Sequence, residues 1–244
     1  MNQKIASITK WIKDYVLNSG AKGVVVGMSG GKDSMIVAKL CTLALGKENV
    51  YGVIMPNGEM PDQNDAMAMC QFLGIMYSII DIKGINELIL NTVSNVCKIN
   101  NNAQINTPPR IRMTVLYAVA ASFGYLVANT SNLSEISVGY STKWGDGVGD
   151  FAPLATLTKT EVCEMGLALG LPKNLVQKTP SDGLSGKTDE DNLGITYENL
   201  DSYIRTGMAN KDTNKILRLH EISGHKREGV AKFESGFKNW LEDK

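Results

Sequence analysis

The residues best suited to chemistry lie in one short glycine-rich segment, which reads Gly27-Met28-Ser29-Gly30-Gly31-Lys32-Asp33-Ser34. Glycine lets a backbone approach a ligand closely, and the start of a helix presents unpaired N–H groups to anions. The segment therefore predicts a site for phosphate or pyrophosphate, and the Asp33 carboxylate is placed to hold a metal ion beside phosphate oxygens. The alternative interpretation is a structural glycine-rich turn without a ligand.

Spacing excludes the two commonest phosphate loops. A Walker loop requires glycine at position 26 and serine or threonine at position 33, where this chain has Val26 and Asp33. The dinucleotide fingerprint spaces its glycines differently from Gly27, Gly30 and Gly31. A phosphate loop of another kind is therefore indicated.

The run from Ser29 to Ser34 resembles the SGGxDS pyrophosphate loop of the N-type ATP pyrophosphatases. Members of that superfamily activate a substrate by adenylation and release pyrophosphate, so the resemblance implies ATP as a co-substrate. The motif is specific to the superfamily and not to one member. Other segments of the chain must therefore distinguish among the members.

Alternating strands and helices must position this loop. The apolar run at 24–26 predicts a buried strand before the loop, and helical spacing predicts a helix over 35–45 after it. The alternation predicts an α/β fold with a doubly wound, mostly parallel sheet and helices on both faces. The resemblance to the N-type ATP pyrophosphatases implies a sheet like that of the adenine nucleotide alpha hydrolases. Further strands are predicted at 50–55, 76–82 and 125–130, and further helices at 1–16, 62–73, 85–97, 110–123 and 158–169. The helix at 110–123 is expected to be entered through Pro108-Pro109, and the helix at 158–169 to be capped by Thr158.

Ligands of such sheets bind beyond the carboxyl ends of the strands. The segments 27–34, 56–61 and 130–150 each follow a predicted strand, so we expect them to surround the ligand. Two other segments, 98–106 and 178–192, are polar and lack apolar periodicity. We predict that both are long connections, serving either as a lid or interface segment or as a disordered surface loop.

Bulk properties narrow the class of protein. The 244 residues are expected to form a single domain spanning 1–244, with a sizeable core because 43% of them are apolar. Basic and acidic side chains number 25 each and no long basic run occurs, so no nucleic-acid partner is expected. No apolar stretch reaches the roughly 18 residues of a membrane span, and no signal peptide is recognised. We therefore expect no membrane partner and a cytoplasmic location.

A second group of polar residues follows the predicted strand at 125–130. Thr130 offers a hydroxyl to an adenosine group, and Glu135 can reach the metal expected at Asp33. Mg²⁺ prefers one or two carboxylates together with phosphate oxygens, which suits this pair. Four glycines then recur within 139–150, which predicts a pliable binding loop for a polar ligand.

These segments resemble those of the ammonia-dependent NAD⁺ synthetases. In that family the corresponding pattern is roughly GTxNxSE followed by GYxTKYGDGxxDxxP. This chain reads Asn129-Thr130-Ser131-Asn132-Leu133-Ser134-Glu135 and then Gly139-Tyr140-Ser141-Thr142-Lys143-Trp144-Gly145-Asp146-Gly147-Val148-Gly149-Asp150. The resemblance extends from about Trp11 to Arg227. An SGGxDS loop joined to a TKYGDG-like segment is highly specific, so the chain is identified as a member of this family.

The resemblance implies roles for individual residues. Asp33 and Glu135 would hold Mg²⁺, and the family works as a homodimer with its second substrate near the subunit interface. Lys143 and Asp150 are also the catalytic candidates, although Asp150 would either accept a proton or position the amine. ATP would be bound by the 27–34 loop, Thr130, Lys159 and Ser181, and deamido-NAD⁺ by Arg110, Lys143, Asp150, His225 and Lys226.

The implied reaction is the last step of NAD⁺ biosynthesis. The nicotinate carboxylate of deamido-NAD⁺ would attack the α-phosphorus of ATP, giving an acyl adenylate and pyrophosphate. Ammonia would then displace AMP and form the amide, as in a ligase that makes a C–N bond. Mg²⁺, lysine and backbone N–H groups would offset the charge of the two reacting anions.

Two alternatives are weighed against this reaction. Another adenylating N-type ATP pyrophosphatase, such as a tRNA thiolase, should show catalytic cysteines and a basic face, which this chain lacks. A nucleotide-binding protein without turnover should have lost Asp33, Glu135 or Lys143, yet all three are present. No cysteine stands in a glutaminase setting, so free ammonia is the expected nitrogen donor.

Overall fold

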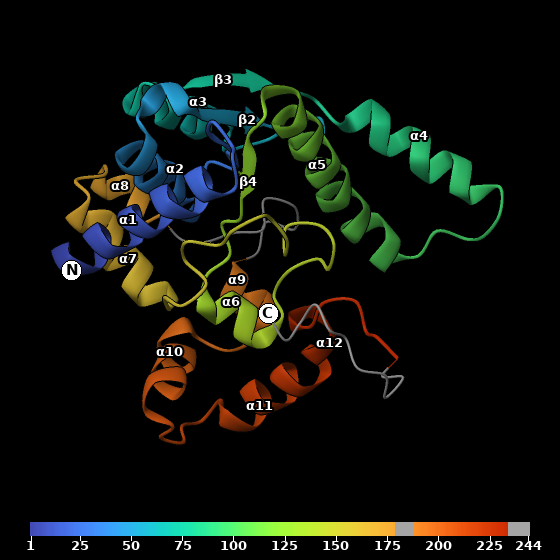
Figure 1. Cartoon of the computed structure of the whole chain (residues 1–244). Helices are drawn as coiled ribbons and strands as arrows, with labels where there is room; N and C mark the ends of the chain where they lie inside the picture. Colours follow the sequence, from blue (N-terminus) through green and yellow to red (C-terminus); the bar gives the residue numbers. More distant parts are fainter. Residues whose placement is uncertain (179–187, 234–244) are drawn as a thin grey trace.

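The computed structural model describes residues 1–178 and 188–233 (Figure 1). Within these residues a four-stranded parallel sheet forms the centre, in the order β3-β2-β1-β4. The α/β class and the parallel sheet expected from the sequence are confirmed. The strands are β1 (Val24–Gly27), β2 (Val50–Ile54), β3 (Met76–Ile79) and β4 (Leu126–Ala128).

The first strand lies in the middle of the sheet. Val26 pairs with Gly52 of β2 on one side and with Ala128 of β4 on the other. The direction in which the chain adds strands therefore reverses at β1, and such a reversal leaves a crevice at the carboxyl ends of parallel strands. The glycine-rich segment 27–34 begins in that crevice.

Period-two alternation along the strands divides the core between the two faces of the sheet. Val24 and Val26 of β1 pack on one face, where the helices form the larger hydrophobic cluster. Val25, Val53 and Val127 point to the other face, against α5 (Asn101–Phe123). The helices of the first face are α1 (Asn2–Asn18), α2 (Lys32–Leu45), α3 (Gln63–Leu73), α7 (Lys159–Ala168) and α8 (Lys173–Val176).

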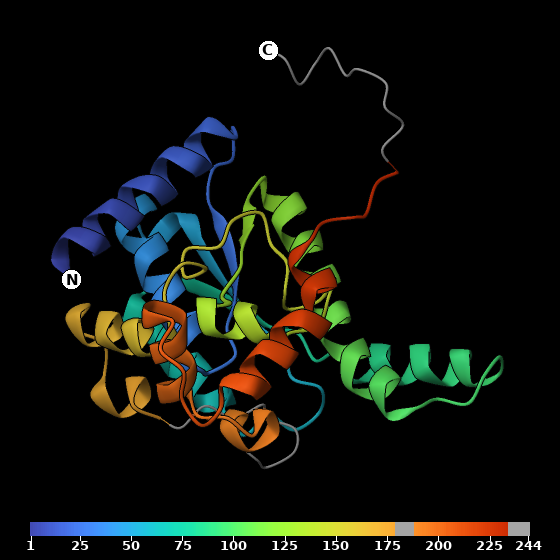
Figure 2. The same cartoon turned by 90° about the horizontal axis from the view of Figure 1, so that it is seen from below.

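A third hydrophobic cluster forms beyond the carboxyl ends of the strands. Leu200 is fully buried there and packs with Val138 and Ile216. Figure 1 shows the helices of this part of the fold together at one end of the molecule, away from β3, and Figure 2 views the molecule from that end. These helices are α6 (Leu133–Val138), α9 (Asp189–Leu193), α10 (Tyr197–Thr206), α11 (Thr213–Ile222) and α12 (Gly224–Arg227).

Helix α4 (Lys83–Ser94) packs against α5 and extends away from the sheet (Figure 1). A short 3₁₀ helix, η1 (Lys47–Asn49), leads into β2. Among the described helices none has the length and apolar character that would let it cross a membrane.

The helix expected at 110–123 starts much earlier than its sequence indicated. α5 begins at Asn101, so the prediction of a polar connection over 98–106 is wrong for most of its length. Asn100 caps this helix, since its side chain accepts a hydrogen bond from the Ala103 N–H at 2.9 Å. Pro108 and Pro109 lie inside the helix instead of opening it, at the cost of the backbone N–H groups that proline lacks.

Smaller differences concern the ends of elements. α2 begins at Lys32, so the last part of the glycine-rich segment is already helical. The strands expected at 76–82 and 125–130 are shorter, because β3 and β4 end where the chain turns toward the crevice. Part of the connection expected at 178–192 is helix α9, whereas 179–187, including Ser181, lies outside the described residues.

Candidate active site

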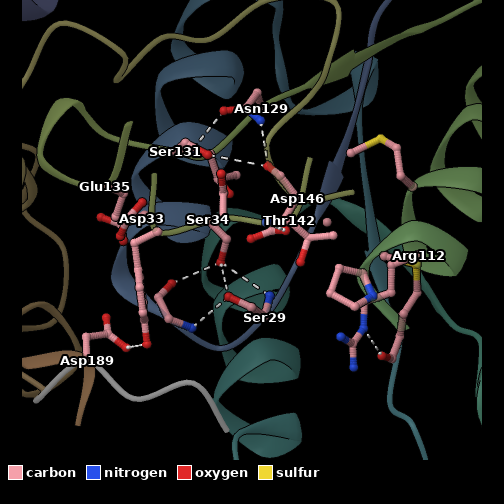
Figure 3. Close-up of a pocket in the computed structure, with 18 of the residues that line it drawn as sticks. Ser29, Asp33, Ser34, Arg112, Asn129, Ser131, Glu135, Thr142, Asp146 and Asp189 are labelled. Atoms are coloured by element: carbon pink, nitrogen blue, oxygen red, sulfur yellow. Dashed lines mark hydrogen bonds between the residues drawn. The ribbon is translucent and has the colours of Figure 1, made fainter. Parts of the chain in front are cut away.

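A cavity of about 750 Å³ opens at the carboxyl ends of the strands. The three segments expected to surround a ligand, 27–34, 56–61 and 130–150, all contribute to its wall. Figure 3 shows Asp33 and Glu135 together on one side of it and Arg112 on the opposite side. The residues predicted to bind ATP or metal that line it are Gly27, Met28, Ser29, Gly31, Lys32, Asp33, Ser34, Thr130, Glu135 and Lys159.

The backbone of the glycine-rich segment is shaped for close approach. Gly30 adopts a φ of +78°, and a Cβ atom there would lie 2.4 Å from the carbonyl oxygen of Asp62. Gly31 then precedes Lys32, the first residue of α2, and no side-chain hydrogen bond caps that start within the described structure. The first N–H groups of α2 are therefore available to an anion, as the sequence predicted.

Three charged groups from three helices meet beside this loop. Lys159 Nζ lies 2.7 Å from Asp33 Oδ2 and 3.0 Å from Glu135 Oε1. The lysine residue is only 5% exposed. We call Asp33, Glu135 and Lys159 the carboxylate–lysine cluster. Two negative charges and one positive charge give it a net charge of −1 when all three groups are ionised.

Burial sets the electrostatics of this cluster. Desolvation raises the pKa of Glu135 to about 7, with Asp33 adding to the rise and Lys159 opposing it. Burial would lower the pKa of the Lys159 ammonium, but the two carboxylates outweigh it and raise that pKa well above its usual value. The lysine therefore stays charged, and its Nζ also lies 5.3 Å from the centre of the Tyr197 ring.

Helix caps place the two residues that meet Asp33. Asn132 caps α6, and the Glu135 carboxylate returns a bond by accepting from the Asn132 N–H at 3.3 Å. Thr158 caps α7 in the same reciprocal manner with Glu161, as the sequence predicted for Thr158. Lys159 is the first residue of α7, so a capped helix start fixes the origin of its side chain.

Most residues predicted to bind deamido-NAD⁺ lie together beside the cavity. Lys143 Nζ donates to the backbone oxygen of His225, and Arg110 Nε donates to the Lys143 carbonyl oxygen at 3.2 Å. Lys226 Nζ donates to two carbonyl oxygens of the segment 139–150, each at 2.7 Å. Of these four residues, only Lys226 contributes to the described wall of the cavity.

Asp150 lies apart from that group. Its carboxylate accepts from the Val127 N–H at 2.7 Å and from the Tyr117 hydroxyl at 3.1 Å. It therefore fixes the edge of β4 to α5, and it is not among the described residues that line the cavity. Its contact with deamido-NAD⁺ stays a prediction.

Arg112 was not among the predicted site residues, although it lines the cavity. Its Nε donates to the Met55 carbonyl oxygen at 3.0 Å, and burial lowers the pKa of its guanidinium. Helical periodicity could have identified Arg112, because residues three or four positions apart lie on the same face of a helix. The cavity-lining residues of α5 are Ile105, Asn106, Pro109, Arg112, Met113 and Leu116, and this stripe excludes Arg110.

Asn129 was also missed, because an asparagine at the end of a strand carries no distinctive signal. Its Nδ2 donates to the carbonyl oxygens of Asp146 and Val148 at 2.9 and 2.8 Å, and its Oδ1 accepts from the Ser131 N–H at 2.8 Å. The two bonds from Nδ2 hold the glycine-rich segment 139–150 against the strand that precedes Thr130.

Comparison with known proteins agrees with this geometry. The fold and the site define a nucleotide-binding α/β protein with a phosphate loop at its switch point. A model described as NAD synthase matches residues 4–238, and the chain belongs to that family. The NH₃-dependent NAD⁺ synthetase of Finegoldia magna is 39% identical over 238 residues, which cover 96% of each protein.

Two solved structures are similar over almost their whole length. The NMN synthetase of Francisella tularensis superposes with a TM-score of 0.90 at 33% identity, covering 96% of this chain and 98% of that one. The NH₃-dependent NAD synthetase of Campylobacter jejuni gives a TM-score of 0.79 at 30% identity, covering 96% and 99%.

We expect Gly30→Ala to weaken ATP binding by about tenfold or more. An alanine at positive φ costs about 1–2 kcal/mol, and its Cβ would strike the Asp62 carbonyl oxygen 2.4 Å away, so the loop must move. Gly124→Ala is the matched control, since Gly124 has a similar φ of +67° with no atom within 4 Å of the new Cβ. The test measures the ATP affinity of both variants by calorimetry, together with their melting temperatures. Equal ATP affinity in both would contradict the shape argument.

Proposed function

We propose that this chain catalyses the ATP-dependent amidation of deamido-NAD⁺ by ammonia, as its resemblance to NH₃-dependent NAD⁺ synthetases implies. Membership of the NAD synthase family over residues 4–238 is the observation that carries the proposal. The site supports it, because a phosphate loop and the carboxylate–lysine cluster meet in one cavity. The whole chain, 1–244, is proposed to act as one synthetase domain.

The first step brings together two anions, the nicotinate carboxylate and the α-phosphate of ATP. The chain offsets their charge with Lys32, Lys159 and the first N–H groups of α2. Lys32 is 8% exposed and Lys159 is 5% exposed, so both cations are fixed before substrate arrives. Charges that need no reorganisation stabilise a transition state best. Attack on the α-phosphorus then yields the acyl adenylate and releases pyrophosphate, with Thr130 and Ser181 proposed to contact ATP.

The second step forms the amide. Ammonia adds to the acyl carbon, AMP leaves, and the nitrogen must lose a proton. Lys143 is proposed to neutralise the dinucleotide, since its carbonyl oxygen accepts from Arg110 and its ammonium donates to the backbone oxygen of His225, the residue before Lys226. Asp150 is the proposed proton acceptor or positioning group for the amine.

Mg²⁺ is the proposed cofactor, held by Asp33 and Glu135. Asp33 Oδ1 is buried and lacks a hydrogen-bond partner among the described residues, so a hard oxygen ligand is free. The described chain offers no group of three or more His, Cys, Asp or Glu side chains for a metal. Two carboxylates suit Mg²⁺, which commonly completes its shell with water and phosphate oxygens. When bound, it would neutralise charge on the phosphates.

Lys159 occupies the position between the two proposed metal ligands. Its ammonium binds Asp33 Oδ2 and Glu135 Oε1, so a divalent cation bound to Asp33 and Glu135 must compete with it for the same two carboxylates. The phosphates of ATP offer the ammonium a second anionic partner. The cavity should therefore accept metal and nucleotide together more readily than metal alone.

Lys159→Met should bind Mn²⁺, without nucleotide, about tenfold or more tightly than the wild type at pH 8. The variant loses the cation that competes for the carboxylates, and one unit charge at this range is worth more than 1.4 kcal/mol even at an effective dielectric constant of about 20. The measurement is Mn²⁺ titration followed by electron paramagnetic resonance.

The double variant Lys159→Met/Glu135→Gln controls for charge. It restores the net charge of the cluster but removes one metal ligand, so it should bind Mn²⁺ more weakly than the single variant. If Lys159→Met binds Mn²⁺ no more tightly than the wild type, the ammonium and the metal do not share the site.

A second candidate substrate comes from the superposition with the Francisella tularensis NMN synthetase, at a TM-score of 0.90. That likeness exceeds the 0.79 found for the Campylobacter jejuni NAD synthetase. The acid that corresponds to NMN is nicotinate mononucleotide, which shares the reacting carboxylate with deamido-NAD⁺ but lacks the adenylate half. The same chemistry would amidate either acid.

One assay separates the candidates. With ATP, Mg²⁺ and ammonium, we expect deamido-NAD⁺ to give NAD⁺ and AMP in equal amounts, measured by chromatography. Ammonia-free glutamine should not replace ammonium. A larger kcat/KM for nicotinate mononucleotide would favour the second candidate, and amidation of neither acid would refute both.

We also propose that the chain forms a homodimer through α4 and the adjoining start of α5. Apolar side chains on these helices and on the turn after α4 face solvent in one subunit, and Leu88 of α4 is 67% and Val96 of the turn 86% exposed. A second copy would remove this surface from water, which stabilises association. The other exposed apolar residues of this surface are Ile85, Ile89, Val93 and Ile105.

Leu88→Glu should weaken the dimer by tenfold or more, since burying one leucine contributes about 1.5–3 kcal/mol. Light scattering coupled to size-exclusion chromatography over a dilution series measures it. Leu217→Glu, at a leucine of α11 that is 48% exposed, is the matched control and should leave the assembly unchanged. A wild-type protein that is monomeric at all concentrations would rule out the dimer.

A further inference from the structure

Asp201 is a buried acid that contributes to no wall of the cavity and has no role in the reaction so far. It lies on α10, within the helices beyond the sheet, and is 6% exposed. Burying a carboxylate is costly unless its oxygens accept hydrogen bonds. Both oxygens of Asp201 accept them, and the donors lie on two other helices, α6 and α7.

The first link is to the start of α7. Asp201 Oδ2 accepts from the Thr160 N–H at 2.8 Å and from the Thr160 hydroxyl at 2.7 Å. Thr160 directly follows Lys159, the cation of the carboxylate–lysine cluster. A carboxylate at a helix N-terminus is also favoured by the helix dipole. Asp201 therefore holds the turn from which Lys159 extends.

The second link is to the start of α6. Asp201 Oδ1 accepts from the hydroxyl of Ser134, and that same hydroxyl oxygen accepts from the Lys159 N–H at 2.9 Å. Ser134 is fully buried and directly precedes Glu135. One carboxylate thus joins the backbone segments that carry both partners of Asp33.

Each of the first three N–H groups of α7 has a hydrogen-bond acceptor. A helix start leaves its first N–H groups without partners inside the helix. Here Ser134 accepts from Lys159, Asp201 accepts from Thr160, and Thr158 accepts from Glu161. Two of the three acceptors belong to other helices, so the position of this helix start depends on α6 and α10.

We propose that Asp201 is a positioning residue for the adenylation step, acting through Glu135 and Lys159. This role rests on the proposed function, because it matters only if the carboxylate–lysine cluster binds Mg²⁺ and ATP. Loss of the carboxylate leaves the Thr160 N–H without its acceptor and frees the start of α7 to shift. A misplacement of about 1 Å is enough to lower a rate about a hundredfold.

The test compares Asp201→Ala with Asp212→Ala, measured well below their melting temperatures. Asp212 accepts from Asn199 Nδ2 at 2.7 Å and from the Thr196 N–H at 3.4 Å, so it supports α10 without touching α6 or α7. Both variants should lower the melting temperature. Only Asp201→Ala should lower kcat for AMP formation, by 30- to 100-fold, with KM for ammonium unchanged.

A second readout does not depend on turnover. Mn²⁺ with a non-hydrolysable ATP analogue should bind Asp201→Ala at least tenfold more weakly than Asp212→Ala. The binding comparison tests the positioning role independently of which acid is amidated. An inactive wild type would refute the proposed function, but the binding comparison would still report on Asp201. Equal nucleotide affinity and equal kcat in the two variants would overturn the positioning role.

Two milder variants guard against a failure to fold. Asp201→Asn keeps an oxygen for the Thr160 N–H, and we expect a smaller loss of kcat than in Asp201→Ala. Ser134→Ala keeps the bonds to Thr160 but cuts the link to α6, and we expect a loss of nucleotide affinity with most of the stability retained. Wild-type kcat and affinity in both variants would also overturn the proposal.

Discussion

The site depends on one buried ammonium held between two carboxylates. Lys159 is 5% exposed and lies within 3.0 Å of both Asp33 and Glu135. Removing one partner from such a group leaves an uncompensated buried charge, which is strongly destabilising. The three groups come from the starts of α2, α6 and α7. The fold must therefore bring three helix starts to one point, and the order of strands at β1 provides that point.

Local signals explain what the sequence could predict. The glycines at 27–34, the apolar strand before them and the cap at Thr158 act within a few residues, so spacing alone identified them. The start of α5 was mispredicted because Pro108 and Pro109 were interpreted as an entry to the helix. The cap is Asn100, in an asparagine-rich run that looks like a loop by composition.

Contacts between distant residues could not be predicted from spacing. Lys159 and Asp33 are 126 positions apart in the sequence, and only the family resemblance grouped them beforehand. Arg110 was selected from a motif, whereas the face of α5 that lines the cavity carries Arg112. Asp201 carried no signal at all, since an acid on an amphipathic helix is usually solvated and its burial follows from the packing of α10.

The two halves of the reaction are supported by different scaffolds. The phosphate loop belongs to the sheet, whereas Lys226 reaches the segment 139–150 from the helices beyond it. An acyl adenylate forms only if the nicotinate carboxylate and the α-phosphorus are held in line, so these scaffolds must be fixed relative to each other. Asp201 supplies such a connection with a few short hydrogen bonds, close to the charges that face ATP. Its burial in the third hydrophobic cluster then serves catalysis as well as stability.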